Sequence, residues 1–214
     1  PRAKAVNVTL SAPTPRRTVE GPPKVGDLAP SLELDRWLTG KGPTSLDDYQ
    51  GQYVVLHFLS PTCNLCAQSV SALSDLQAQF EKYGVVVIGV ARVVEGEPSW
   101  SLPPGSPTTG TAVKLGDTPM AMSHFLHATR PIYAVAADKD GVTLKRYGVK
   151  PRETEWVLAP SGAITWRKHT LRGENGESCY LVGRDGKLLW MGTGGDQGLV
   201  DMLVERIRAE RKQK

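Results

Sequence analysis

The chain has 214 residues, of which 40% are hydrophobic and 22% charged, a balance typical of one globular domain with room for insertions. Its 26 Lys and Arg residues against 22 Asp and Glu give a formal net charge of +4, but no basic stripe with interleaved aromatic residues accompanies it, so nucleic-acid binding is not expected. Three cysteines are too few for a scaffold built on disulfides, and no apolar run is long enough to cross a bilayer.

The first 24 residues differ in composition from the rest. Residues 1–24 are rich in Pro, Arg, Thr and Ser, which is typical of a linker or arm. The chain starts at Pro1 and not at Met, so we expect this arm to lead to a membrane anchor outside this chain. Residues 25–214 are expected to form one domain.

A strand, a helix and a second strand are predicted next. The stretch from Gln52 to Leu59 is an almost continuous apolar run, which predicts a strand buried on both faces. Apolar residues at helical spacing follow Cys66, and Gly84 predicts the end of that helix. Residues 85–90 form a second apolar run. This order predicts a βαβ unit with a right-handed crossover.

A loop insertion separates this unit from the next elements. Residues 94–117 are rich in Pro, Gly, Ser and Thr, and a connection of this length is usually a functional or a disordered surface loop. Thr118 and Pro119 resemble the N-cap and first residue of a helix that runs to about Ala128. A further strand is expected over residues 131–137.

Two similar segments near the C-terminus each have the pattern strand, glycine-containing turn, strand. They cover residues 154–167 and 178–191, and they predict two hairpins in one antiparallel region. Apolar residues at helical spacing then predict a C-terminal helix, with Leu199, Met202, Leu203 and Ile207 on its apolar face.

Cys63 and Cys66 form a Cys-x-x-Cys pair between the first strand and the helix. No second pair and no closely spaced histidine pair accompanies them, which argues against a structural zinc site. At the N-terminus of a helix, unpaired backbone N–H groups and the helix dipole stabilise a thiolate, so the pKa of Cys63 should fall. Cys66, one turn inside the helix, can attack the mixed disulfide that Cys63 forms. The context therefore favours redox chemistry, with metal binding and an inert pair as the alternatives.

The residues around this pair resemble a known family. The stretch VGDLAPSLELDRWLTGKGPTSLDDYQGQYVVLHFLSPTCNLC is similar to the TlpA-like thiol-disulfide oxidoreductases of bacterial envelopes, and FLSPTC also resembles the methylamine dehydrogenase accessory thioredoxin. The resemblance continues in RPIYAVAADKDGVTLKRYGV and covers roughly Val25 to Gly192. It implies the α/β class and a thioredoxin fold, a central mixed β-sheet flanked by helices, here with an extra C-terminal β-hairpin. It also implies disulfide exchange and often a membrane anchor.

The sequence departs from this family at positions that shape the substrate groove. The family's cis-proline beside the disulfide falls by count on Glu153 if residues 154–167 form the family strand, and on Glu177 if residues 178–191 do. We favour the first hairpin, so that Glu153 lies near the thiols after a trans peptide bond and residues 178–191 are an extension. The acidic residue that many members carry three positions after the second cysteine is Ser69 here.

The predicted site therefore has two redox cysteines and four flanking residues. Cys63 is expected to attack and Cys66 to resolve, and the expected substrate contacts are Thr62, Asn64, Leu65 and Glu153. No cofactor and no metal is expected. The expected partners are protein disulfides and a membrane or soluble electron donor, in a periplasmic or otherwise extracytoplasmic location with a membrane tether.

Other cysteine and histidine residues have two readings each. Cys179 is either a buried thiol that packs as a small hydrophobe or a third redox thiol. His57, inside the first buried strand, is either a satisfied core histidine or a third ligand or proton acceptor for Cys66. His124 and His127 are expected on the surface of a helix and not at a metal.

Three other functional classes compete with disulfide exchange. Copper-handling proteins of the Sco type use Cys-x₃-Cys and a histidine shortly before the late hairpin, whereas this chain has Cys-x₂-Cys and no histidine between Ala128 and Lys168. A peroxiredoxin needs Pro-x₃-Thr-x₂-Cys, and the run from Ser60 to Cys63 does not have that spacing. A thioredoxin-like binding module that has lost turnover stays open as an alternative.

Overall fold

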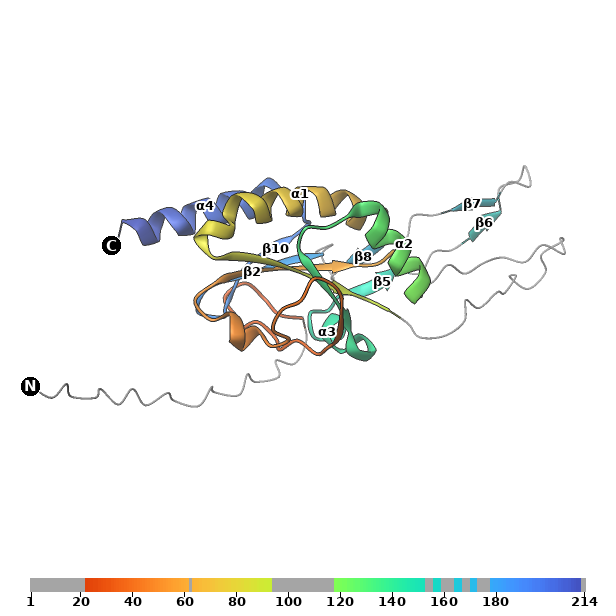
Figure 1. The fold of residues 1–214 in the computed structure, drawn as a ribbon, viewed down its shortest axis with the longest axis horizontal. Helices are drawn as coiled ribbons and strands as arrows, with labels where there is room; N and C mark the ends of the chain where they lie inside the picture. The colour runs from red at the N-terminus through yellow and green to blue at the C-terminus, as the bar shows by residue number, and fades with distance from the viewer. Residues whose placement is uncertain are drawn as a thin grey trace, which may run out of the picture.

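Six strands form the central sheet of this protein (Figure 1). The computed structural model describes residues 22–61, 63–93, 118–152, 156–158, 164–166, 170–172 and 178–212. In spatial order the strands are β1 (Leu34–Thr39), β4 (Ala134–Asp138), β3 (Val85–Ala91), β2 (Tyr53–Leu59), β9 (Cys179–Val182) and β10 (Leu188–Gly192). β2 pairs with β3 and β3 with β4 in parallel, while β1, β9 and β10 each pair antiparallel with a neighbour. The sheet is therefore mixed.

Helices cover both faces of the sheet. One face carries three long helices, α1 (Asn64–Phe80), α2 (Pro119–Thr129) and α4 (Gln197–Arg211), and the short α3 (Val142–Arg146) lies on the other (Figure 1). Three 3₁₀ turns complete the described helical segments: η1 (Leu46–Tyr49), η2 (Glu81–Tyr83) and η3 (Lys139–Gly141). The order β2-α1-β3-α2-β4 with parallel pairing produces two successive crossovers on the same face.

The middle of the sheet is buried on both faces. All seven residues of β2 are buried, as the continuous apolar run predicts for a strand with a helix layer on one side and packed loops on the other. On the face of α3 an aromatic cluster fills the core, where the rings of Phe58, Tyr147 and Tyr180 lie 5.0–5.4 Å apart between centroids. The hydroxyl groups of this cluster are satisfied, since Tyr180 Oη donates to the Tyr147 carbonyl at 3.0 Å and Tyr147 Oη to the Pro30 carbonyl at 2.9 Å.

Polar contacts connect the C-terminal part of α4 to the start of β2. Tyr53 Oη donates a hydrogen bond to Glu210 Oε1 at 2.6 Å, and Arg184 Nε lies 3.1 Å from the same carboxylate oxygen. The Arg184 guanidinium also stacks over the Tyr53 ring, 4.9 Å from its centroid. Burial and the hydrogen bond to Glu210 raise the pKa of Tyr53 to about 12, so Tyr53 is a hydrogen-bond donor at neutral pH.

The two edges of the sheet are irregular or covered. Residues 26–29 run beside the start of β10, where Gly26 N donates to Leu188 O and Leu188 N donates to Asp27 O. Ala29 N also donates to Gly186 O in the preceding turn. At the opposite edge, the pairing of β1 with β4 shifts register twice along its length.

Most of the predicted elements are present with small changes at their ends. The predicted βαβ unit is β2, α1 and β3, and Gly84 ends the helical segment in the left-handed region with φ of 75°. Thr118 caps α2, since its hydroxyl accepts from Ala121 N, as the Thr-Pro pair predicts. The strand β1 was not predicted, because its residues show neither strict alternation nor a continuous apolar run.

One prediction about the hairpins is wrong. The hairpin of residues 178–191 supplies β9 and β10, and β9 pairs directly with β2, so it is this hairpin and not that of residues 154–167 that lies beside the strand leading to the Cys-x-x-Cys pair. In the earlier segment, among the residues that the structure describes there, β6 (Trp156–Leu158) pairs with β7 (Ile164–Trp166) and with no other strand. A second small sheet joins β5 (Lys150–Arg152) to β8 (Thr170–Arg172), and β8 lies near α1 and β2. The two segments have similar apolar patterns, so local pattern could not decide between them.

Some predicted features lie outside the described residues. These are the linker as far as residue 21 and the insertion at residues 94–117. Among the helices that the structure describes, none combines the length and the apolar character that a membrane crossing requires.

Candidate functional site

The Cys-x-x-Cys pair lies where β2 leads into α1. After Leu59 the chain turns, with Cys63 N donating to Ser60 O at 3.1 Å, and Cys63 is the N-cap of α1 in an extended conformation (φ −96°, ψ 102°). Its sulfur accepts a hydrogen bond from Cys66 N at 3.1 Å, the role that a serine or aspartate oxygen has at other helix N-caps. The cap places the sulfur at the positive end of the helix, where a thiolate is stabilised.

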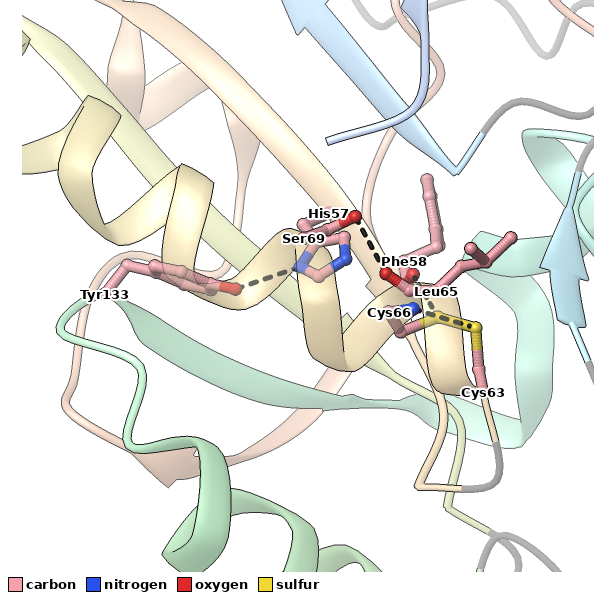
Figure 2. The surroundings of a disulfide bond; sticks show 7 residues. All are labelled: His57, Phe58, Cys63, Leu65, Cys66, Ser69 and Tyr133. Atoms are coloured by element: carbon pink, nitrogen blue, oxygen red, sulfur yellow. Dashed lines mark hydrogen bonds between the residues drawn. A yellow bond between two sulfur atoms is a disulfide. The ribbon is translucent and has the colours of Figure 1, made fainter. Parts of the chain in front are cut away.

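Cys63 and Cys66 form a disulfide (Figure 2). Their Cα atoms are 5.2 Å apart, within the ordinary range, so the bond fits one helical turn. The two residues are 2% and 1% exposed, and Cys66 Sγ lies 3.7 Å from the Phe58 carbonyl oxygen. In the disulfide, Cys66 Sγ therefore lies against the end of β2.

A buried histidine lies in β2, the strand that leads to this disulfide. His57 precedes Phe58 in β2 and is 0% exposed. Its Nδ1 is 2.9 Å from Tyr133 Oη, while its Nε2 has no hydrogen-bond partner among the described residues. Burial lowers the pKa of His57 to about 3, so the imidazole is neutral at physiological pH.

Cys179 is the neighbour of His57 across the sheet. The register places Cys179 of β9 directly opposite His57 of β2, and Gly89 of β3 on the other side of the histidine. Cys179 is a free thiol with 0% exposure, and burial raises its pKa far above the usual range. It is therefore a neutral thiol packed in the core. Tyr133 is buried too, and burial and the neighbouring Cys179 raise the pKa of its phenol.

The loop after β10 packs closely against α1 and β9 at Gly194. Gly194 is buried, and a Cβ at its position would lie 2.7 Å from Ser69 Cβ, 2.9 Å from Leu73 Cδ1 and 3.0 Å from Cys179 Sγ. The backbone of the loop after β10 thus contacts both α1 and β9. Ser69 Oγ donates to the Leu65 carbonyl at 3.0 Å, so its proton is used within α1 (Figure 2).

The predicted site residues have different outcomes. Cys63, Cys66 and the half-buried Leu65 come together at the start of α1, and Asn64 is its first residue. Thr62 lies outside the described residues. Glu153 lies outside them as well, and its assignment assumed the hairpin order that β9 contradicts, so the substrate contact predicted for it has lost its basis.

The remaining sequence predictions concern the exposure of the other histidines and possible metal ligands. His124 and His127 are exposed on α2, as the sequence predicts. In the part of the chain that the structure describes, no three His, Cys, Asp or Glu side chains are grouped so that they could hold a metal ion. Sequence reasoning missed Tyr133 and Gly194. No local signal marks either one, because both contacts join residues far apart in the chain.

Comparisons with known proteins agree with this geometry. Residues 25–97 match the model of the AhpC/TSA family. The thiol-disulfide oxidoreductase ResA of Oceanobacillus iheyensis is 24% identical over 143 residues, which are 66% of this chain and 62% of that protein. ResA of Bacillus thuringiensis is 24% identical over 147 residues, 69% of this chain and 70% of the relative. The match to the first of these relatives thus spans less than two thirds of its length.

Solved structures share the fold. A candidate thiol:disulfide interchange protein DsbE from Chlorobium tepidum has a TM-score of 0.55 at 24% identity, covering 86% of this chain and 99% of that one. A thiol-disulfide isomerase from Corynebacterium glutamicum has a TM-score of 0.52 at 18% identity, covering 84% and 96%. The chain thus has a thioredoxin fold, its residues 25–97 are similar to the AhpC/TSA family, and the similar curated proteins are named thiol-disulfide oxidoreductases.

Proposed function

We propose that this protein exchanges disulfides with other proteins through the Cys63–Cys66 couple. The observation that carries the proposal is the position of Cys63 as N-cap of α1, with its sulfur accepting the N–H of Cys66. This hydrogen bond and the helix dipole favour the thiolate of Cys63 over the thiol, and the thiolate is the nucleophile in disulfide exchange.

The exchange has two steps. In the reduced protein the Cys63 thiolate attacks a substrate disulfide, a bond forms between Cys63 Sγ and one substrate sulfur, and the other substrate sulfur leaves as a thiolate. Cys66 Sγ, which loses its proton, then attacks Cys63 Sγ, so that the Cys63–Cys66 disulfide forms and the first substrate sulfur leaves. Two electrons have passed to the substrate. The reverse sequence oxidises a dithiol substrate.

The residues that flank the couple are proposed to contact the substrate. Thr62, Asn64 and Leu65 surround the attacking sulfur in the sequence, and none of them carries a charge that would strongly tune the couple. The direction of electron flow is set by the reduction potential of the couple. A reduction potential of about −270 mV indicates a reductase, and one of about −120 mV indicates an oxidant.

We place the reaction outside the cytoplasm, on a domain tethered through residues 1–24. The resemblance of the sequence to oxidoreductases of bacterial envelopes supports this location, and the Pro-rich composition of residues 1–24 suits a tether. Protein disulfides are the proposed substrates, and a membrane or soluble electron donor regenerates the couple. Fractionation of the native host with an antibody to the chain tests this location. Recovery in the cytosol would contradict it.

Trapping tests the exchange itself. We expect Cys66→Ser to accumulate a mixed disulfide with a protein substrate such as insulin, because the resolving thiol is absent, whereas the matched variant Cys63→Ser should not. Non-reducing electrophoresis detects the adduct, and insulin reduction by the unaltered chain measures turnover. Equal trapping by both variants would contradict the assigned roles. Binding without any turnover would favour the thioredoxin-like binding module instead.

A further inference from the structure

The small ladder formed by β5 and β8 combines three cationic residues with no acidic one, since β5 has the sequence Lys-Pro-Arg and β8 the sequence Thr-Leu-Arg. The two strands are antiparallel, and their register pairs Lys150 with Arg172, Pro151 with Leu171 and Arg152 with Thr170. Residues opposite each other in such a ladder share a face, and the faces alternate along each strand. One face, here called the cationic face, therefore holds all three cations with Thr170, and the other holds the apolar pair.

Two of these cations are direct neighbours across the ladder. Lys150 and Arg172 are register partners, and like charges in this position repel each other and destabilise a strand pair. Lys150 is exposed, so the cationic face is open to solvent at this position. A negative charge supplied from outside the ladder relieves the repulsion. The arrangement therefore favours an anionic ligand.

The ladder lies at the end of the sheet that carries the Cys-x-x-Cys pair. β8 contacts both α1 and β2, the two elements that meet at the disulfide. In Figure 1, β5 and β8 lie where β2 passes into α1, and the C-terminal end of α4 lies at the opposite end of the molecule. A protein whose disulfide is attacked by Cys63 therefore brings its neighbouring residues towards the cationic face.

Several described groups at this end of the sheet leave the positive charge uncancelled. The first turn of α1 has no acidic residue, and the first carboxylate of that helix, Asp75, lies about three turns further on. Asp138, at the end of β4, accepts two backbone N–H groups of α3 at 2.8 and 2.9 Å, so both of its oxygens are used within the protein. Arg92 brings a further positive residue, and its backbone N–H donates to the Leu59 carbonyl at the end of β2 at 3.2 Å.

We propose that the cationic face binds acidic side chains next to the disulfide of a substrate protein, so that this chain acts preferentially on disulfides flanked by Asp or Glu. The proposal rests on the disulfide exchange proposed above and names the class of substrate. Charges at the rim of an interface act mainly on the rate of encounter and on its salt dependence. The cationic face should therefore raise the rate at which Cys63 attacks an acidic substrate. The resolving step takes place within the chain and should not change.

Three peptides measure this preference. Each contains the same intramolecular disulfide, and the residues that flank its cysteines are Asp, Asn or Lys. The initial rate of reduction by the reduced protein is followed by acid quenching and mass spectrometry, and it is divided by the rate with dithiothreitol, which corrects for the reactivity of each disulfide. We expect the Asp peptide to react about 10-fold faster than the Asn peptide at low ionic strength, and the Lys peptide to react more slowly than both. At about 0.5 M salt the rates should converge, because the charges are screened.

The double variant Lys150→Gln/Arg172→Gln removes the two opposed charges. We expect it to lose most of the preference for the Asp peptide and to keep its rate with the Asn peptide. Lys82→Gln/Arg208→Gln is the matched control, because it removes the same charge at exposed residues of η2 and α4, away from the ladder, and it should keep the preference. An effect of the cations on the Cys63 thiolate would change the rates of all three peptides alike, so the ratio of the rates isolates the contact.

Binding can be measured without turnover. Backbone ¹H–¹⁵N NMR of the oxidised chain reports contact with the same peptides in which serine replaces both cysteines. We expect the Asp peptide to shift the amide signals of Lys150, Arg152 and Arg172 and the Asn peptide to leave them unchanged. Failure of the disulfide exchange appears as no reduction of any peptide. Failure of the present inference appears as equal rates and no selective shifts, so the two are distinguishable.

Four results would overturn the proposal. They are equal corrected rates for the Asp and Asn peptides, a preference that persists in Lys150→Gln/Arg172→Gln, binding to phosphatidylglycerol vesicles with no preference among the peptides, and neutralisation of the cations by the chain's own carboxylates. Glu153 and Glu174, which follow the two strands closely in the sequence, lie outside the described residues. Neutralisation within the chain would make the double variant lower the urea midpoint and leave the peptide rates unchanged. Under the proposal the midpoint stays or rises, because a repulsion is removed. If the double variant does not fold, the salt dependence and the amide shifts of the unaltered chain carry the test.

Discussion

Gly194 provides a quantitative test of how the loop after β10 packs. A Cβ at this position would lie 2.7 Å from Ser69 Cβ, 2.9 Å from Leu73 Cδ1 and 3.0 Å from Cys179 Sγ, all shorter than ordinary contacts. Two of these atoms belong to α1 and one to the central sheet, so neither side can move freely. Inserting a methyl group into such a site costs about 1–3 kcal/mol. We expect Gly194→Ala to lower the free energy of unfolding by about that amount.

Gly195→Ala is the control for Gly194→Ala. A Cβ at Gly195 meets nothing within 4 Å, and the residue is exposed. Neither glycine has a positive φ, so an alanine is not strained by the backbone at either position. Replacing a glycine in this way restricts the unfolded chain and stabilises by about 0.4–1 kcal/mol. Urea unfolding followed by circular dichroism should therefore separate the two variants in opposite directions.

A double substitution locates the strain. Ser69→Gly removes the atom closest to the new methyl group. Alone it should destabilise the protein by about 1 kcal/mol, because glycine lowers helix stability. In the Gly194→Ala background, Ser69→Gly should lower the free energy of unfolding by less than it does alone, since it removes the close contact with the new methyl group. If Gly194→Ala proves as stable as Gly195→Ala, or if the two substitutions are additive, the close packing of this loop on α1 is incorrect.

Three further predictions follow from the site and the core. At neutral pH, Cys63 in a Cys66→Ser variant should react with iodoacetamide faster than Cys66 in a Cys63→Ser variant, because a helix N-terminus stabilises a thiolate. The reverse order would contradict the role assigned to Cys63. The pKa of His57 is lowered from 6.5 to about 3, so the unfolded chain binds a proton in this interval that the folded chain does not. Compared with a His57→Asn variant, the unaltered protein should therefore lose about 1.4 kcal/mol of unfolding free energy for each pH unit between pH 6.5 and about pH 3. Denaturant titrations at several pH values measure this difference. Equal pH profiles for the two proteins would refute the burial of His57. Tyr53→Phe should lower the free energy of unfolding by about 0.5–1.5 kcal/mol, because the hydrogen bond from Tyr53 Oη to Glu210 is lost while the contact of Glu210 with Arg184 remains. No change in the urea midpoint would mean that this hydrogen bond does not stabilise the attachment of α4.

The parts of the fold that sequence reasoning predicted are those set by local patterns. The apolar run of β2, the helical spacing in α1 and the glycine at its end are read within a few residues of one another, and so is the Cys-x-x-Cys pair between them. The choice between the two hairpins was not local. The two segments have similar apolar patterns, and only the pairing of β9 with β2 distinguishes them.

The histidine site illustrates the same limit at the level of single atoms. Sequence alone placed His57 in a buried strand and left its role open between a core residue and a partner of Cys66. Its contact with Tyr133 joins residues that are 76 positions apart and depends on the order of β2, β3 and β4 in the sheet. A tertiary contact of this kind cannot be predicted from periodicity, because each residue alone fits an ordinary buried position.

The irregular edges of the sheet influence how another protein can approach this one. An edge strand with a regular row of free N–H and C=O groups is a template for the addition of a foreign strand, and with it for aggregation or peptide capture. Here the two register shifts of β1 interrupt that row on one side, and residues 26–29 occupy the start of β10 on the other. Adding a foreign strand is therefore less favourable along β1 and at the start of β10 than it would be along regular, uncovered edge strands.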